Sequence, residues 1–176
     1  LDIARDKGFS FYVGPDMEFF YFAQAEGGRP TNTPLDTGGY FDLTTADVAT
    51  DLRRRTILAL ESIGVPVRYS HHEDSPSQHE IDLRYTDALS TADNIMTFRL
   101  IMKQVALEQG IYEAVMDKPW AEDPGTGMHK TLYLVEGDRN ACVGGDAEAQ
   151  RRKEGRGGEG GTVREREGRR GGDNRG

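Results

Sequence analysis

The strongest indication of regular structure in this chain is a β-signal between Gly8 and Gln24, which reads GFSFYVGPDMEFFYFAQ. Aromatic and β-branched residues are frequent in it, and such residues favour a pleated, partly buried surface. Gly14-Pro15 breaks the run once, and this dipeptide is typical of a turn. We therefore predict a strand, a turn at Gly14-Pro15 and a second strand, which makes β-sheet a necessary part of the fold.

Two later segments carry helical signals. Thr44 with an Asp three residues later forms a capping box, an approximate apolar stripe follows, and Gly64 is placed to end the helix. Ser90 is likewise followed by an Asp, and apolar residues then recur at helical spacing until Gly110. We predict a helix over each segment.

Four further segments are short strand candidates. They cover residues 65–73, 79–85, 113–116 and 130–135, whereas residues 26–39 have the composition of a long loop. The segment 79–85 alternates polar and apolar residues, which is typical of a half-buried strand. Strands that follow one another across short turns, without regularly interleaved helices, favour an α+β fold over a doubly wound sheet.

The composition of the chain changes at Cys142. Residues 142–176 contain 11 of the 22 glycines, no aromatic residue and no aliphatic residue larger than Val. Such a segment cannot bury enough apolar surface to offset the entropy of ordering it, so we predict a disordered tail. One folded unit is expected over residues 1–141, which hold 13 basic and 23 acidic residues and carry a net charge of −10.

The acidic folded part narrows the range of partners. It repels phosphate backbones and anionic lipids, which disfavours nucleic acid and membrane surfaces and favours divalent cations. No apolar run approaches the roughly 18 residues of a membrane span, and the first residues have no signal-peptide pattern. The single cysteine excludes an intrachain disulfide, and a cytoplasmic location is expected.

Two carboxylates stand two residues apart after the predicted turn. Asp16 and Glu18 therefore project from one face of a strand, either into water or toward a cation that lies between them. Apolar neighbours on both sides, Val13 and residues 19–22, favour the cation.

Two more carboxylates flank the polar turn that follows. Glu73 and Glu80 lie seven residues apart, and a hairpin-like return brings such residues near each other. With Glu18 they could form a three-carboxylate site for Mg²⁺ or Mn²⁺, which prefer oxygen ligands. Three histidines crowd the same turn and leave zinc as an alternative: His71, His72 and His79.

A Gly-rich segment, Gly125-Thr126-Gly127-Met128-His129, precedes the last strand candidate. Either it is an ordinary turn, or it lets the backbone approach a ligand closely beside a histidine. It is not a P-loop, which needs Gly-Lys-Ser/Thr at the start of a helix.

Four motifs occur in order along the chain. They are Gly14-Pro15-Asp16-Met17-Glu18-Phe19-Phe20, then His71-His72-Glu73 with Gln78-His79-Glu80-Ile81-Asp82-Leu83-Arg84-Tyr85, then Thr91-Ala92-Asp93-Asn94-Ile95-Met96-Thr97-Phe98, then Gly125-Thr126-Gly127-Met128-His129. In this order and spacing they resemble the successive signatures of type I glutamine synthetase, a glutamate–ammonia ligase. In detail the sequence is most similar to actinobacterial glutamine-synthetase-like paralogues, some of which resemble γ-glutamylpolyamine synthetases.

The resemblance implies an activity and an architecture. The family makes γ-glutamyl phosphate from ATP and glutamate, and ammonia then displaces the phosphate. Two or more Mg²⁺ or Mn²⁺ ions screen the anionic reactants in such a reaction. The implied fold is the first half of the catalytic domain, a curved, largely antiparallel sheet backed by helices. The implied partners are glutamate, ammonia or another amine, ATP, and further copies of the chain in a homododecamer.

The resemblance also assigns metal ligands and catalytic residues. Glu18, Glu73 and Glu80 correspond to the residues that hold the metal orienting glutamate and the transferred phosphate. Asp16 and His129 correspond to ligands of a second metal, which binds the ATP phosphates. The family usually has Glu at the first of these positions, so Asp16 reaches one methylene less far.

The same resemblance indicates where substrates bind. Gly125 and Gly127, with His129, correspond to the glutamate-binding loop of the family. Tyr85 falls near the nucleotide pocket.

Several residues depart from the family pattern. Arg68 stands where a Glu near the nucleotide is usual, Asp117 replaces a usual Pro, and Thr131 and Tyr133 occupy nucleotide-side positions of the family's His-x-His-x-Ser. The chain is expected to be a partial catalytic domain over residues 1–141 that is inactive alone, followed by a tail of non-family sequence. Two alternatives stay open: a γ-glutamylpolyamine or other γ-glutamylamide synthetase, and a non-catalytic metal-binding remnant.

Overall fold

The computed structural model describes residues 1–43 and 49–141. The predicted helix start at Thr44 and the tail predicted over residues 142–176 lie outside the described residues. Within them the elements in chain order are α1 (Asp2–Asp6), β1 (Ser10–Ala25), β2 (Arg29–Pro34), α2 (Thr50–Ser62), β3 (Val67–His72), β4 (Gln78–Leu83), β5 (Thr86–Asp87), α3 (Ala88–Glu108), β6 (Ile111–Ala114), β7 (Met128–Glu136) and β8 (Arg139–Asn140).

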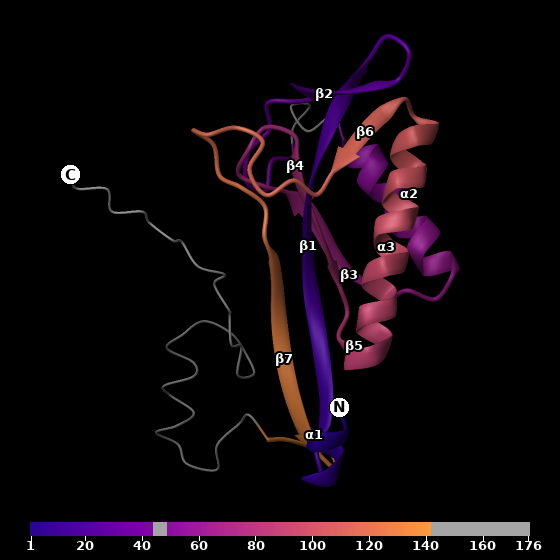
Figure 1. Cartoon of the computed structure of the whole chain (residues 1–176), viewed down its shortest axis with the longest axis vertical. Coiled ribbons are helices and arrows are strands. Elements are labelled where there is room, and N and C mark those ends of the chain that lie inside the picture. The colour runs from indigo at the N-terminus through magenta and orange to yellow at the C-terminus, as the bar shows by residue number, and fades with distance from the viewer. Residues whose placement is uncertain (44–48, 142–176) are drawn as a thin grey trace, which may run out of the picture.

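Strand β1 is the centre of the sheet. It pairs antiparallel with β2, β4, β5, β6 and β7, while β3 extends the sheet beyond β4 and β8 extends it beyond β7. Figure 1 shows β7 running beside β1 and shows α2 and α3 together on one side of the sheet. The predicted α+β fold, with a curved antiparallel sheet backed by helices, is confirmed.

The predicted turn at Gly14-Pro15 is wrong, because β1 is one strand of 16 residues that passes through this dipeptide. On one side Gly14 and Pro15 pair with β7. On the other side they lie opposite the gap between β4, which pairs from Asp16 onward, and β5, which pairs up to Val13. Proline is tolerated here because no ladder partner on that side requires its missing N–H.

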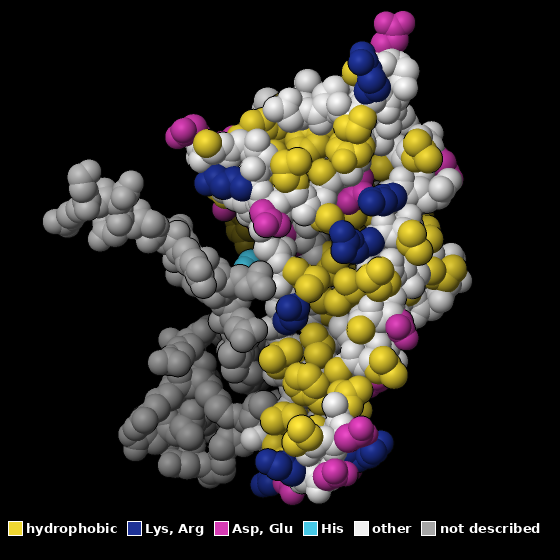
Figure 2. Space-filling view, viewed as in Figure 1, with side chains coloured by type: hydrophobic (Ala, Val, Ile, Leu, Met, Phe, Trp, Pro, Cys, Tyr) yellow, Lys and Arg dark blue, Asp and Glu magenta, His cyan; other side chains and the backbone are white. Residues whose placement is uncertain are grey.

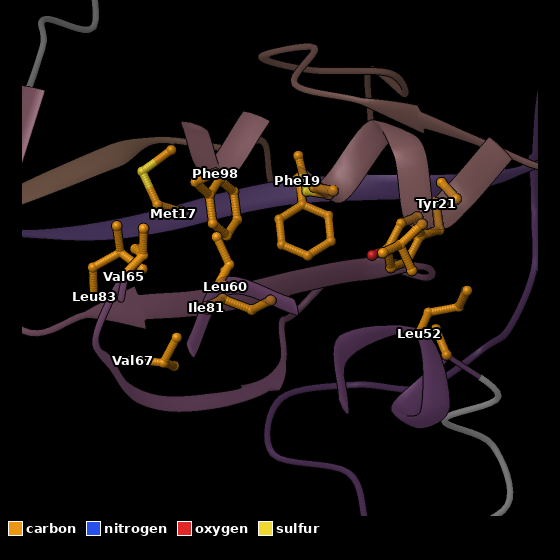
Figure 3. Packing of buried hydrophobic residues seen from close by; sticks show 14 residues of the cluster. Met17, Phe19, Tyr21, Leu52, Leu60, Val65, Val67, Ile81, Leu83 and Phe98 are labelled. Atoms are coloured by element: carbon orange, nitrogen blue, oxygen red, sulfur yellow. The ribbon is translucent and has the colours of Figure 1, made fainter. Parts of the chain in front are cut away.

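One face of β1 builds the main core. Met17, Phe19 and Tyr21 alternate along the strand, and all three are almost completely buried against the helices. Phe98 of α3 and Leu60 of α2 complete the same cluster, which Figure 3 shows between the strands and the helices. The helices are therefore held to the sheet by apolar packing on this face.

The even-numbered residues of β1 point to the opposite side of the sheet, which we call the open face. Toward the end of β1, Phe20 and Phe22 stack on each other and meet Trp120 edge-on, with ring centroids 5.5–5.7 Å apart. Earlier in the strand the same face carries Asp16 and Glu18.

Both predicted helices are confirmed, but their ends differ in detail. α3 begins at Ala88 rather than Ser90, because the side chain of Asp87 accepts hydrogen bonds from the backbone N–H groups at the helix start. α2 is described from Thr50, and the chain leaves it through Gly64, whose φ of +86° suits a residue without Cβ.

The strand predictions need two corrections. β2 lies inside the predicted loop 26–39 and forms a hairpin with the end of β1, although its Thr, Asn and Pro residues give little strand signal. β4 is buried on both faces rather than half-buried as its alternation predicts. At the Gln78 end of β4 the Gly-rich segment packs against the second face, where Nε2 of Gln78 donates to the backbone O of Gly125.

The helix surface that faces away from the sheet is partly apolar. Four exposed residues of α3 recur at helical spacing along one side: Leu89, Met96, Leu100 and Leu107. Figure 2 shows further hydrophobic side chains on the visible face, most of them over the middle of the molecule. Exposed apolar surface of this kind marks contacts with other protein. No helix of the described residues is long and apolar enough to cross a membrane.

We expect Phe98→Ala to lower the free energy of unfolding by about 3–5 kcal/mol, because it removes a completely buried ring from the main core. Met96→Ala is the matched control on the same helix, and it should change that free energy by less than about 0.5 kcal/mol because Met96 is exposed. Urea denaturation followed by circular dichroism measures both. Equal effects of the two substitutions would contradict the packing of α3 on the sheet.

Candidate functional site

The open face gathers charged side chains from neighbouring strands. Cross-strand partners share a face of a sheet. Asp16 of β1 pairs with Asp82 of β4 on one side and with His129 of β7 on the other, and Glu18 pairs with Glu80. Strand register therefore assembles a polar site from distant parts of the sequence.

Two groups of side chains on this face lie close enough to share a cation. The ligand atoms of His71, Glu73 and Glu80 lie within 4.8 Å of one another, and so do those of Asp16, Glu80 and Asp82. Nε2 of His71 lies 3.6 Å from Oε2 of Glu80, and its Nδ1 lies 3.5 Å from Oε1 of Glu73. Glu80 belongs to both groups and links them; we call the five residues together the acidic cluster.

The hydrogen bonding of His71 suits it to bind a metal. Its Nδ1 lies 2.9 Å from the backbone O of His72, and a carbonyl oxygen only accepts, so Nδ1 carries the proton of the neutral ring. Nε2 then presents its lone pair on the side of Glu80. Metal-binding histidines commonly donate their other N–H to a carbonyl in this way.

Two carboxyl groups of the acidic cluster, those of Glu80 and Asp82, are buried beside like charges. Burial raises the pKa of Glu80 well above its usual value, and the neighbouring Asp82 and Glu73 carboxyl groups raise it further. Oδ1 of Asp82 is buried and has no hydrogen-bond partner among the described residues. A divalent cation would bind this oxygen and relieve the repulsion, so the donor set fits Mg²⁺ or Mn²⁺.

Glu18 stands beside the acidic cluster and has partners of its own. Its Oε2 accepts from the backbone N–H of Gly127 at 2.9 Å and from Nε2 of Gln78 at 3.3 Å. Its Oε1 lies 3.1 Å from Nδ1 of His129. Burial raises the pKa of Glu18 to about 7; the hydrogen bond from Gly127 opposes this shift, and nearby carboxylates add to it.

The Gly-rich segment packs its backbone directly against the site. A Cβ at Gly125 would collide with the backbone O of Asp117, so the fold requires glycine there. The same oxygen accepts the N–H of Thr126 at 2.7 Å, which fixes the segment. Gln78 donates both to Gly125 O and to Glu18, and so ties the segment to the carboxylates.

A cavity of about 580 Å³ opens on the same face. Its wall includes Tyr85, Thr131 and Tyr133, the three residues expected on the nucleotide side. The rings of Tyr85 and Tyr133 lie 5.2 Å apart, and Gly14 lets Tyr85 approach β1 closely. Asp16 belongs both to this wall and to the acidic cluster, so the cavity and the cluster are continuous.

The three histidines of the predicted turn are separated by the sheet. His71 faces the acidic cluster, whereas His72 and His79 pair with each other across β3 and β4 on the helix side, where both are completely buried. Alternation along each strand explains the separation. A single site therefore cannot include all three histidines, and zinc as the alternative metal stays a prediction.

The predicted ligand sets share the open face but are grouped differently. Glu73 and Glu80 come together with a histidine, whereas Glu18 contacts His129. His129 is the register partner of Asp16, yet its ring contacts Glu18. The five predicted metal ligands are neighbours on one face, and Glu18 bridges the Gly-rich segment and the acidic cluster.

A second polar cluster, buried on the helix side, consists of Asp36, Arg53, His72, Ser77 and His79. Oδ1 of Asp36 accepts from the backbone N–H of Ser77 at 2.8 Å and lies 2.9 Å from Nε2 of His72. Nη1 of Arg53 donates to Nδ1 of His79 at 2.8 Å. Burial, together with the Arg53 charge, lowers the pKa of His79 well below its usual value, so this ring is neutral.

This buried cluster fixes the turn between β3 and β4. Ser77 has a φ of +56°, which is unusual for a residue with a Cβ, and its Oγ accepts from the N–H groups of the loop before α2 at 2.6 and 3.0 Å. Nδ1 of His72 lies 2.7 Å from the backbone O of Glu73. Asp36 therefore holds the backbone that positions Glu73 and Glu80.

Sequence reasoning misses three residues of this arrangement: Asp36, Gln78 and Asp82. Asp82 had a usable signal, since it lies two residues after Glu80 in a predicted strand and so shares its face. Gln78 lies within a quoted motif but bears no charge. Asp36 lies in a segment with the composition of a loop, and nothing local indicates its burial.

Comparison with known proteins identifies the family. The model of the family described as glutamine synthetase, catalytic domain, matches residues 1–165. A glutamine synthetase of Mycolicibacterium smegmatis is 51% identical over 138 residues, which are 78% of this chain and 31% of that protein. The chain belongs to the glutamine synthetase family. The family match passes residue 141, the end of the predicted partial domain, and that boundary stays a prediction.

Other proteins match in sequence and in structure. The glutamine synthetase of Halobacterium salinarum is 45% identical over 135 residues, which are 77% of this chain and 30% of that protein. The ligand-free structure of GmaS has a TM-score of 0.72 at 28% identity and covers 83% of this chain and 35% of its own. The Plasmodium falciparum glutamine synthetase, at 23% identity, shares the fold with a TM-score of 0.71 over 82% of this chain and 34% of its own. The chain thus spans about a third of the length of these proteins.

We expect Glu18→Gln to change how stability depends on pH in the metal-free protein. The folded-state pKa of Glu18 is raised from 4.5 to about 7, so the folded state binds the proton more tightly than the unfolded state does. Protonation of Glu18 therefore stabilises the folded state. This stabilisation is fully present below pH 4.5 and is lost as the pH rises through 7. The melting temperature of the wild type should therefore fall, relative to that of Glu18→Gln, across this range.

The control for this experiment is Glu26→Gln, in the exposed turn after β1. Its melting temperature should follow that of the wild type at each pH. Near pH 7, added Mn²⁺ should restore the melting temperature that the wild type has lost relative to Glu18→Gln, because the cation binds the charged carboxylate. If the melting temperatures of Glu18→Gln and the wild type changed equally with pH, the raised pKa of Glu18 would be contradicted.

We expect Asp36→Ala to lower the free energy of unfolding by about 3–5 kcal/mol, because it leaves buried partners of a charged group unpaired. Asp74→Ala, at an exposed position of the same turn, should change it by less than about 0.5 kcal/mol. Urea denaturation at neutral pH measures both. Burial opposes ionisation of Asp36, but the hydrogen bonds from His72 and Ser77 outweigh it and lower the pKa.

The difference in the free energy of unfolding between Asp36→Ala and the wild type should also depend on pH. A carboxyl whose folded-state pKa is lowered contributes stability above its unfolded value of 3.8, and that stability is lost as the pH falls through the folded value. The difference should therefore shrink in acid. A constant difference from neutral pH into acid would contradict an ionised Asp36.

Proposed function

We propose that this chain provides the metal-binding carboxylates and the nucleotide cavity of a glutamine synthetase. The proposed reaction is the ATP-dependent ligation of ammonia to the γ-carboxyl of glutamate through γ-glutamyl phosphate. The observation that carries the proposal is that Asp16 belongs both to the cavity wall and to the acidic cluster. A nucleotide in the cavity would therefore present its phosphates to cations held by the cluster.

The residues fit distinct parts of this reaction. Glu73 and Glu80, with His71, would hold a Mg²⁺ or Mn²⁺ ion, and Glu18, Asp16 and His129 are placed beside it. Such ions neutralise anionic oxygens and hold reacting groups in line. Glutamate and ATP both carry negative charge, so cations at the acidic cluster would offset the repulsion between these ligands and its carboxylates.

The Gly-rich segment would contribute the binding of glutamate. Gly125 and Gly127 bring backbone groups next to Glu18, and His129 lies at the start of the following strand. Tyr85, with Thr131 and Tyr133, would line the nucleotide side. These assignments follow the family resemblance, and the arrangement on the open face supports them.

A cytoplasmic homo-oligomer, a dodecamer by family resemblance, is part of the proposal. The exposed apolar side of α3 supports a large interface, whether with other parts of a full-length subunit or with further subunits. Because the chain spans about a third of its relatives, we propose that it has no ligase activity by itself.

Mn²⁺ binding tests the metal site in the chain itself. We expect the 176-residue chain to bind Mn²⁺, and Glu80→Gln to weaken binding by about tenfold or more, because Glu80 links both halves of the acidic cluster. Electron paramagnetic resonance of free Mn²⁺ measures the affinity. Glu26→Gln is the charge-matched control outside the site. Equal affinities for the wild type and Glu80→Gln would show that no site is assembled.

A chimera tests the reaction. The 138 matched residues of the Mycolicibacterium smegmatis glutamine synthetase are replaced by those of this chain, and ammonia-dependent phosphate release is measured with ATP and glutamate. We expect activity, and a fall in kcat of about 10²-fold or more for Glu80→Gln in the chimera. Glu26→Gln should leave kcat unchanged.

The same chimera separates the alternatives. Activity with putrescine or ethanolamine in place of ammonia would support a γ-glutamylamide synthetase instead. An assembled chimera that binds Mn²⁺ but releases no phosphate with any amine would support a non-catalytic metal-binding remnant. Arg68, Thr131 and Tyr133 in the cavity wall are the observation that favours this last alternative, because they replace the usual residues of the family.

A further inference from the structure

The cavity beside the acidic cluster has a basic side. Arg68 and Arg84 both line it, although residues 1–141 carry a net charge of −10. Within the described residues neither guanidinium forms an ion pair with a carboxylate: Arg84 donates from Nε to the backbone O of Val67, and Arg68 lies over the ring of Tyr69 at 5.2 Å. Two positive charges therefore line the cavity without a direct ion pair, and Asp16 contributes a carboxylate to the same wall.

A bulge in β3 explains why Arg68 reaches the cavity. Val67 pairs with Leu83 and is buried in the main core, but the register shifts before Tyr69, which pairs with Asp82. Arg68 is the extra residue at this shift. A bulge of this kind re-aims a side chain relative to the regular alternation. Here it turns β3 from the core side at Val67 to the open face at Tyr69 and leaves Arg68 in the cavity wall.

The composition of the cavity wall suits a phosphorylated aromatic ligand. Its volume of about 580 Å³ lies within the range of small-molecule sites. Tyr85 and Tyr133 supply aromatic rings to one part of the wall, and the two arginines supply cations. A guanidinium binds phosphate oxygens through two parallel N–H bonds, which a lysine or a hydrated cation cannot reproduce.

The charge at position 68 is opposite to that of the resembled family. A Glu near the nucleotide repels phosphate unless a metal ion lies between them, whereas an arginine attracts phosphate directly. Asp16 is also shorter than the usual Glu. Both changes shift charge neutralisation in the cavity from bound cations toward a side chain of the protein.

We propose that Arg68 binds the phosphates of the nucleotide directly, with Arg84 beside it, so that this chain holds a nucleoside diphosphate or triphosphate without a divalent cation. This inference deepens the proposed function and rests on its nucleotide cavity. Arg68 thereby takes over part of the charge neutralisation that carboxylate-held cations would otherwise supply.

Isothermal titration of the full chain with ADP and with adenosine, each in EDTA and in Mg²⁺, tests the proposal. In EDTA the wild type should bind ADP more tightly than adenosine. Arg68→Met should weaken ADP binding in EDTA by about tenfold and leave adenosine binding unchanged. Arg68→Lys keeps the charge but not the paired N–H groups. Its affinity for ADP in EDTA should therefore lie between those of the wild type and Arg68→Met. Arg29→Met, at an exposed position of β2, is the matched control.

Competition identifies the part of the ligand that is recognised. Inorganic pyrophosphate should displace bound ADP from the wild type, but it should not displace bound adenosine. Pyrophosphate should not bind to the Arg68→Glu variant. ADP affinity of Arg68→Met within about twofold of wild type in EDTA would overturn the role of Arg68 and leave the proposed function standing. Failure of the folded wild type to bind ADP or adenosine, with or without Mg²⁺, would overturn the nucleotide cavity and the proposed function together.

Discussion

The two-residue period of β1 is the constraint on which the rest of the structure depends. Met17, Phe19 and Tyr21 face the helices and bind them through the main core, while Asp16 and Glu18 face the other way. A shift of one residue in its pairing would exchange these faces, so the core fixes the register of the site. The apolar packing that stabilises the fold also determines which carboxylates are neighbours.

The acidic cluster depends on support from behind the sheet. Carboxylates held side by side in a buried place repel each other, and the raised pKa of Glu80 expresses this cost. The turn that carries Glu73 is nevertheless held in place by hydrogen bonds, because Asp36, His72 and Ser77 tie it to the loop before α2. A stable scaffold of this kind can keep like charges together until a cation binds.

The chain combines features of its family with changes of its own. The order of the motifs and the fold agree with the glutamine synthetase catalytic domain, whose family model covers most of the chain. By the family resemblance the cavity wall differs, with Arg68 at a bulge of β3 and Thr131 and Tyr133 on β7. These residues line the cavity from both sides of β1, whereas Glu73 and Glu80 do not line it.

The sequence by itself determined the helices, most strands, the α+β class and the surroundings of the carboxylates, because hydrophobic period, caps and motifs are local signals. Only the tertiary structure decided the continuous β1 through Gly14-Pro15, the pairing of β2 and the division of the histidines between two faces. Asp36 illustrates the reason. Its role comes from partners 36 and 41 residues away, and contacts at that distance leave no mark on the local sequence.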